Sequence, residues 1–327
     1  MVSVSVIIVN YNTRDLTYEC LKSIFEFTKD LQFQIIVVDN NSSDNSVEFI
    51  KENFPLVDIV KSHLNLGFGR ANNLGVNIAK GDFLFFLNSD TRLLENSIKY
   101  FHDFFKKYEN ELKIGALGCI LLDENFVMNN YGGRFPIVNT IIKQALLNQF
   151  IRLIPFRKKV GLIFPKLSSK IKLLYLKNKI SFNSENKNYF KVDQVIGADM
   201  FMRKSLFSEF NGFSEDFFMN YEETDLQKRI ADYGFSQFIL KDTKIIHIGG
   251  GSGLKKKKNF QRIVTHQSMH IYLRIHDKKN YHKLLSMQII YFFVCFLMPQ
   301  YTFEENIKYN KAMLAFLIDN KIIGINS

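Results

Sequence analysis

Two polar residues follow a run of apolar ones in the N-terminal half of the chain. Phe83–Leu87 is apolar at every position, which predicts a central parallel strand covered on both faces. Asn88 and Asp90 come directly after it, at the carboxyl end of the strand, where ligands bind in open α/β sheets. A carboxylate beside an amide oxygen can hold a hard divalent cation, which can in turn hold a diphosphate. A plain strand-ending turn is the alternative, since Asn, Ser and Asp are favoured in turns.

Acidic residues gather at the start of a predicted helix in the second half of the chain. Glu222, Glu223 and Asp225 fall within one helical turn. Acids in a first turn stabilise a helix through its dipole without any chemistry. A carboxylate in this place could equally take a proton from a substrate hydroxyl. The residues alone leave both interpretations open.

Strands and helices alternate through the N-terminal half and would bring polar residues to one edge of a sheet. Three predicted strands precede Phe83–Leu87, and Asn10 and Asp39 follow the first two. The alternation predicts an α/β fold with a mostly parallel central sheet and helices on both faces. The predicted strands are Val2–Val9, Phe33–Val38 and Val57–Val60, and the predicted helices are Arg14–Thr28, a segment ending near Asn53, and Phe68–Ala79.

Several motifs, in register along about residues 2–253, resemble the successive signatures of family 2 glycosyltransferases, and within that family its rhamnosyltransferase-like branch. Motifs that match in order and spacing are more specific together than any one alone. They are Val4–Asn12, Val37–Asp44, Asn65–Gly75, Asn88–Asp90, Gly197-Ala198, Gly212-Phe213, Phe217–Met219, Tyr221–Leu226 and His247–Ser252.

The resemblance implies a nucleotide-binding GT-A fold and a role for each matching residue. Asp39 would bind the nucleobase or ribose of a nucleotide-sugar. Asp90 would hold Mn²⁺ or Mg²⁺, with His247 as a second contact, although Asn88 stands where the family commonly has a first Asp. Glu223 would be the base that deprotonates the acceptor hydroxyl, with Glu222 as the second candidate. The other residues expected to bind the nucleotide-sugar are Asn10, Asn65, Gly67, Arg70, Asn72, Asn88, Gly197 and Ala198.

Gly67 and Gly69 also invite comparison with the dinucleotide-binding fingerprint of oxidoreductases. That fingerprint needs a third glycine and a position directly after a strand. Asn72 stands at the third glycine's position, and the segment His63–Leu66 separates the motif from the preceding predicted strand. The oxidoreductase interpretation therefore fails on both counts.

The net charge of +11 is concentrated in one segment. Residues 132–182 hold eleven Lys or Arg residues and no acid, so the rest of the chain is balanced. The segment is also apolar, which favours basic amphipathic helices at an anionic membrane surface. A helical lid with a solvated basic face is the alternative, and nucleic acid is disfavoured because no nucleic-acid motif is present.

The remaining features of the sequence limit the class of protein and its cellular location. Three scattered cysteines fit neither a disulfide framework nor a zinc site, and no signal peptide is recognisable, so we expect a cytoplasmic protein. Residues 284–303 carry no charge, but their solid apolar core is too short for a confident membrane span. We expect a GT-A domain over residues 1–253, with the basic insert at about 132–182, and a helical C-terminal extension over 254–327.

The expected function is inverting transfer of a sugar, with rhamnose as one candidate, from a nucleotide diphosphate to a hydroxyl of a glycan or lipid-linked acceptor. Such a protein would act in cell-surface polysaccharide synthesis, peripherally at the inner face of the cell membrane. The alternative is a non-catalytic sugar-nucleotide-binding or membrane-scaffold protein that retains the fold.

Overall fold

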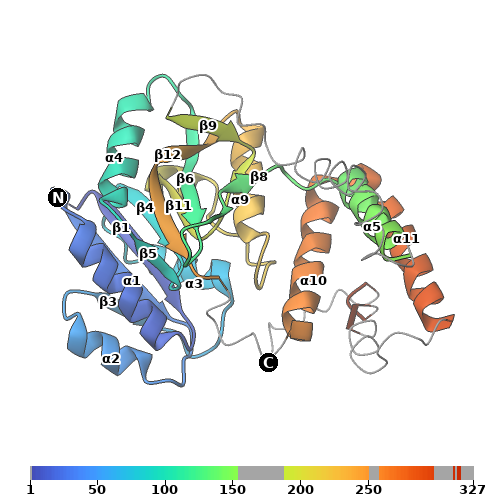
Figure 1. The fold of residues 1–327 in the computed structure, drawn as a ribbon, viewed down its shortest axis with the longest axis horizontal. Coiled ribbons are helices and arrows are strands. Elements are labelled where there is room, and N and C mark those ends of the chain that lie inside the picture. The colour runs from blue at the N-terminus through green and yellow to red at the C-terminus, as the bar shows by residue number, and fades with distance from the viewer. Residues whose placement is uncertain (1, 154–187, 250–257, 298–311, 314, 318–327) are drawn as a thin grey trace.

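The structure is a computed structural model that describes residues 2–153, 188–249, 258–297, 312–313 and 315–317 (Figure 1). Ten strands of these residues form one sheet, with helices against both of its faces. The α/β fold with a mostly parallel central sheet is therefore as predicted.

The N-terminal half forms a parallel sheet in the order β3-β2-β1-β4. Its β-branched and aromatic residues suit strands that are buried on both faces. The first predicted strand begins two residues later than expected and includes Asn10, and the third helix ends at Val76 rather than Ala79. The elements are β1 (Val4–Asn10), α1 (Arg14–Phe27), β2 (Phe33–Asp39), α2 (Ser46–Asn53), β3 (Asp58–Lys61), α3 (Phe68–Val76) and β4 (Phe83–Leu87).

The second half extends this sheet with an antiparallel strand at its centre. Strand β11 lies between β4 and β6 and runs antiparallel to both, while β12 is parallel to β6. The strand predicted over 191–196 is divided at Asp193 into β9 and β10. The elements are β5 (Thr91–Leu93), α4 (Ser97–Tyr108), β6 (Ile114–Leu122), β7 (Met128–Asn130), β8 (Gly132–Gly133), β9 (Tyr189–Val192), β10 (Gln194–Val195), β11 (Asp199–Arg203), α8 (Lys204–Glu209), α9 (Glu222–Asp232) and β12 (Ser236–His247).

Strand β4 supplies apolar side chains to both layers of the core. Phe83 and Phe85 face the cluster that includes α1 and α4, and the ring of Phe83 stacks 5.3 Å from that of Phe201 on β11. Phe86 faces the opposite cluster, which includes α3 and α9. Burial on both faces fixes the strand in the sheet and places Asn88 and Asp90 at its carboxyl end.

Three further helices pack together beside the sheet, on the right in Figure 1. They are α5 (Val138–Leu153), α10 (Lys258–His276) and α11 (Lys278–Leu297). Asp277 between α10 and α11 accepts a hydrogen bond from the backbone N–H of Val138, which opens α5 (2.8 Å). The start of the predicted insert therefore belongs with the C-terminal helices in one apolar cluster.

Other parts of the insert and tail predictions fall on residues 154–182 and 298–311, outside the described residues. Within the described part of the chain, no helix combines the length and apolar character needed to cross a bilayer.

Candidate active site

Asp39, at the carboxyl end of β2, is held from two sides. Its Oδ1 accepts a hydrogen bond from Nδ2 of Asn10 (2.9 Å), and its Oδ2 accepts one from the backbone N–H of Ser42 (3.1 Å). Asn10 was expected to bind the nucleotide-sugar, but its side chain is fully buried, and its Oδ1 accepts hydrogen bonds from Thr13 and Thr17. The Asn10 amide is therefore placed to orient Asp39, and its role in binding the nucleotide-sugar stays a prediction.

The same polar chain joins Asp39 to the Asn88–Asp90 segment. Oγ1 of Thr13, which bonds Asn10, lies 3.0 Å from Oγ of Ser89. A line of buried hydrogen bonds thus runs from the end of β2 to the end of β4. The predicted nucleotide and metal positions therefore share one edge of the sheet.

Asn88, Asp90 and His247 come together at that edge, as the sequence predicted. Nε2 of His247 lies 3.3 Å from Oδ1 of Asp90 and 3.3 Å from Nδ2 of Asn88. Strand β12 delivers His247 because its last residue pairs with Thr91, next to Asp90. The backbone N–H of Ile248 also donates to the carbonyl of Asp90 (3.0 Å).

This group fits a divalent cation in part. One carboxylate, one imidazole and one amide suit Mn²⁺ or Mg²⁺, which commonly use one or two protein carboxylates and complete their coordination with phosphate oxygens and water. No group of three or more His, Cys, Asp or Glu side chains within metal-binding reach exists among the described residues. These three side chains could therefore hold a cation only together with phosphate oxygens and water.

Gly197 and Ala198 connect this cluster to the catalytic candidates. The carbonyl of Ala198 accepts a hydrogen bond from the backbone N–H of Asn88 (3.0 Å). A Cβ on Gly197 would lie 3.4 Å from Cγ of Glu223, so that carboxylate side chain packs against the glycine. Ala198 is itself buried, which gives it a supporting position.

The loop before α3 is tied to the sheet by Asn40, a residue not singled out by sequence. Its Nδ2 donates to Asn65 Oδ1 (3.0 Å) and to the carbonyl of Gly67 (2.9 Å), and its Oδ1 accepts the N–H of Leu66 (2.8 Å). Gly67 has φ +80° and ψ −164°, a conformation that is nearly exclusive to glycine. The backbone N–H of Phe68 donates to the carbonyl of Phe218 (3.0 Å). This glycine therefore allows the loop to contact the segment that leads to α9.

Three residues of this loop and helix that are expected to bind the nucleotide-sugar also make hydrogen bonds within the protein. Asn65 uses its carbonyl oxygen inside the loop, on Asn40 and the N–H of Gly67. Asn72 is buried and donates to the carbonyl of Phe68 (3.0 Å). Arg70 donates two hydrogen bonds to the carbonyl of Glu215 rather than presenting a free guanidinium. These contacts hold the α3 region together, and the roles of the three residues in donor binding stay predictions.

Glu222 and Glu223 open α9 in different surroundings. Glu223 is half-buried and lines a cleft of about 150 Å³ with Asn130, the β8 glycines and residues 194–196. Glu222 is buried against Gly69 of α3, and its Oε2 has no hydrogen-bond partner among the described residues. Burial, followed by the nearby charge of Glu223, holds the pKa of Glu222 well above its usual range. Burial also raises the pKa of Glu223. The arrangement favours a charged Glu223 beside a neutral Glu222.

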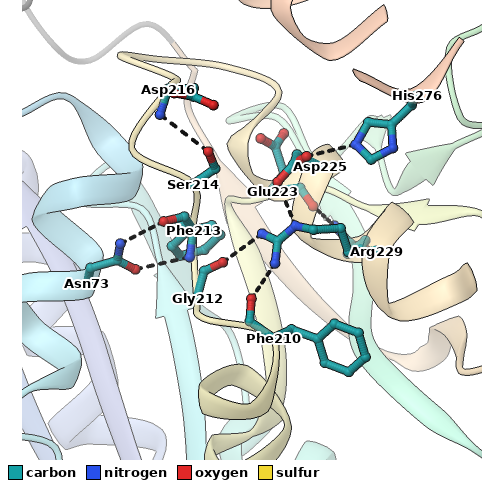
Figure 2. A network of polar contacts seen from close by, with 11 residues as sticks. Asn73, Phe210, Gly212, Phe213, Ser214, Asp216, Glu223, Asp225, Arg229 and His276 are labelled. Carbon is teal, nitrogen blue, oxygen red and sulfur yellow. Dashed lines mark hydrogen bonds and ion pairs between the residues drawn. The ribbon is translucent and has the colours of Figure 1, made fainter. Parts of the chain in front are cut away.

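Asp225 has no free oxygen. Nε of Arg229 donates to its Oδ2 (2.9 Å), and Nε2 of His276 lies 2.7 Å from its Oδ1. Figure 2 shows the carboxylate between these two side chains, close to Glu223. Asp225 is therefore a structural residue of the site.

Asp199, at the start of β11, is a buried acid that the sequence did not single out. Its Oδ2 accepts the backbone N–H of Cys119 (2.6 Å), and its Oδ1 has no hydrogen-bond partner in the described part of the chain. Burial raises its pKa to about 7. Its only sequence signal was a charged residue at the head of an apolar strand.

Residues 5–162 match the family model for glycosyl transferase family 2. This part of the chain is similar to family 2 glycosyltransferases. A poly(ribitol-phosphate) beta-glucosyltransferase of Bacillus spizizenii is 29% identical over 119 residues, which cover 35% of this chain and 19% of that protein. Glycosyltransferase GlyG of Streptococcus pneumoniae is 30% identical over 151 residues, 45% of this chain and 50% of that protein. The chain thus spans about half, or less, of the length of these relatives.

Two solved structures have a fold similar to that of this chain. A mannosyltransferase from Pyrobaculum calidifontis, in complex with GDP-Man and Mn²⁺, matches with a TM-score of 0.53 and 14% identity, over 96% of this chain and 80% of its own. Residues 1–349 of TarS from S. aureus match with a TM-score of 0.50 and 13% identity, over 83% of this chain and 65% of theirs. The fold is accordingly of the GT-A type.

Proposed function

We propose that the chain is an inverting glycosyltransferase that moves a sugar from a nucleotide diphosphate to a hydroxyl of a glycan or lipid-linked acceptor in cell-surface polysaccharide synthesis. One observation carries the proposal. The two residues just before β11 contact both halves of the site, since Ala198 bonds Asn88 and Gly197 packs against Glu223. A displacement at an anomeric carbon requires a base and a diphosphate-binding group held near each other in this way.

The donor side of the site is built from strand ends. Asp39 binds the base or ribose of the nucleotide-sugar, in an orientation fixed by Asn10 and Ser42. Asp90, His247 and Asn88 would hold a divalent cation. When bound, the cation offsets the negative charge that develops on the leaving group.

The acceptor side depends on Glu223. Its carboxylate takes the proton of the acceptor hydroxyl, and the hydroxyl oxygen forms a bond to the anomeric carbon as the bond to the diphosphate breaks on the opposite face. Configuration at that carbon inverts. Glu222 remains protonated because it is buried beside this charge, so the pair carries a single negative charge.

The acceptor is proposed to lie at the inner face of the cell membrane, where the protein binds peripherally through the basic insert. The net charge of +11 and the apolar content of residues 132–182 support this. The relative named for poly(ribitol-phosphate) supports a cell-surface polymer as the acceptor class. Rhamnose is one proposed sugar, beside glucose and mannose from the proteins named above. N-acetylglucosamine is the fourth, from a 29% identical relative named poly(ribitol-phosphate) beta-N-acetylglucosaminyltransferase TarP of Staphylococcus aureus.

The test is release of nucleoside diphosphate from a panel of nucleotide-sugars carrying these four sugars, with Mn²⁺, Mg²⁺ or EDTA and a membrane lipid extract as the acceptor. We expect release from one donor, lost in EDTA. Donor binding without any release across the panel would overturn the proposal in favour of a non-catalytic sugar-nucleotide-binding protein.

A further inference from the structure

The segment that leads into α9 has an unusual backbone. Asn220 and Tyr221, the two residues before Glu222, have φ of +67° and +72°. Left-handed conformations are uncommon outside glycine, and an aromatic residue rarely adopts one. Such a backbone persists only where the surrounding structure holds it in place. The position of Glu223 therefore depends on whatever contacts this segment.

Helix α10 supplies those contacts from far along the chain. It lies against residues 219–221 along much of its length, through both polar and aromatic groups. The contacts are Ser268 Oγ to the carbonyl of Met219 (2.9 Å), Asn220 Nδ2 to Thr265 Oγ1 (2.9 Å), and the ring of Tyr221 at 5.5 Å from that of Tyr272.

The last residue of α10 completes this support. Nε2 of His276 lies 2.7 Å from Oδ1 of Asp225, whose backbone N–H bonds the carbonyl of Tyr221 (2.8 Å). An ionised carboxylate can only accept, so Nε2 carries the hydrogen. The His276 side chain is 9% exposed and that of Asp225 is 3% exposed, so water cannot readily replace either partner.

The other oxygen of Asp225 extends the network to the loop before α9. Arg229 bonds this oxygen and also donates to the carbonyls of Phe210 and Gly212 (Figure 2). Asp225 is thus fixed on one side by the glycosyltransferase domain and on the other by the C-terminal helices.

We propose that His276 is a positioning residue for transfer: by holding Asp225 it sets the first turn of α9 and hence the carboxylate of Glu223. This inference rests on the proposed role of Glu223 as the base. Removing the imidazole leaves a buried carboxylate oxygen without its partner, and the turn two residues from Glu223 relaxes. A misplacement of about 1 Å costs on the order of a hundredfold in rate, because the reacting atoms must be aligned.

The experiment compares His276→Phe with His276→Gln. Phe keeps a ring against Tyr272, which lies 4.7 Å from the imidazole, but removes the hydrogen-bond donor. Gln keeps an N–H donor in place of Nε2. His282→Phe, on the exposed surface of α11, is the matched control. Rates are read as kcat and KM for the nucleotide-sugar, and hydrogen exchange is followed over residues 217–225.

We expect His276→Phe to lower kcat by about ten- to a hundredfold with KM within about threefold, and to speed exchange over 217–225. His276→Gln should recover most of kcat, and His282→Phe should match the wild type. Equal losses in the Phe and Gln variants, or unchanged kcat in His276→Phe, would overturn the proposal. If the wild-type protein turns over no donor, the proposed function fails. Hydrogen exchange over residues 217–225 then tests separately whether His276 holds this segment in place. Unchanged exchange in His276→Phe would exclude that role.

Discussion

Gly67 provides a sharp test of how the loop before α3 meets the segment before α9. A Cβ on this residue would lie 2.7 Å from the carbonyl carbon of Phe218 and overlap its oxygen. Both neighbours are backbone, so no side chain can move aside. Gly67→Ala must therefore push the loop away from residues 217–221 and break the hydrogen bond between Phe68 and Phe218.

The cost can be estimated from its parts. Forcing Ala into this glycine conformation costs about 1–3 kcal/mol. Loss of the bonds from Phe68 to Phe218 and from Asn40 to the Gly67 carbonyl adds about 1 kcal/mol each. We expect Gly67→Ala to lower the free energy of unfolding by about 3–5 kcal/mol and to reduce kcat/KM for the nucleotide-sugar.

Gly234→Ala is the matched control, because Gly234 also has a positive φ (+88°) but no atom within 4 Å of a new Cβ. It should cost only about 1–2 kcal/mol, from the left-handed backbone alone, and leave kcat/KM unchanged. Thermal and urea unfolding of both variants, with donor titration by calorimetry, measure the difference. Equal destabilisation by the two substitutions, with wild-type donor affinity in Gly67→Ala, would refute the packing argument.

Two further predictions concern the acids of the site. Glu222→Gln should retain most of the activity, because burial already keeps Glu222 protonated. Since the folded pKa of Glu222 lies above its unfolded value, the folded state binds more protons, and wild-type stability falls as pH rises from the unfolded pKa to the raised one. The melting temperature of the wild type should therefore fall as pH rises, and that of Glu222→Gln should fall less, while the two proteins should melt at the same temperature near pH 4. Parallel curves of melting temperature against pH would contradict a raised pKa of Glu222. Asp90→Asn should weaken Mn²⁺ binding by about tenfold or more, measured by calorimetry with donor present, because it removes the one carboxylate of the cluster. Asp30→Asn is the control, because Asp30 is exposed and has a left-handed backbone that Asn adopts readily. Equal Mn²⁺ affinity in the Asp90→Asn and Asp30→Asn variants would exclude Asp90 as a ligand.

The sequence predicted the edge of the sheet well because strand ends are local signals. Phe83–Leu87 is buried on both faces, so Asn88 and Asp90 had to emerge at its carboxyl end, and His247 follows another strand of the same sheet. Motif order then brought Asp39 to the same edge. Local periodicity was sufficient for Asn88 and Asp90, while the roles of Asp39 and His247 came from the resemblance to the family.

The functions of individual polar residues were harder to predict, because a motif does not say whether a side chain faces a ligand or the interior. Asn10, Asn65 and Asn72 belong to the matched motifs, yet the side-chain amide of each makes at least one hydrogen bond within the protein. Asn40 gives the same kind of support and was missed. Only the three-dimensional partners of each amide separate these roles.

Long-range partners were not predictable from the sequence. His276 lies 51 residues from Asp225 in the chain, and no spacing rule links a helix end to a helix start at that separation. The packing of α5 with α10 and α11 is similar, since their apolar residues indicate burial but not which surface covers them.

Glu223→Gln tests the proposed role of Glu223 as the base most directly. The substitution keeps the size of the side chain but removes the group that accepts the proton. We predict that transfer to the acceptor is lost, while the affinity for the nucleotide-sugar with Mn²⁺ stays close to that of the wild type. A Glu223→Gln variant that transfers sugar at the wild-type rate would contradict the central claim and remove Glu223 from the role of the base.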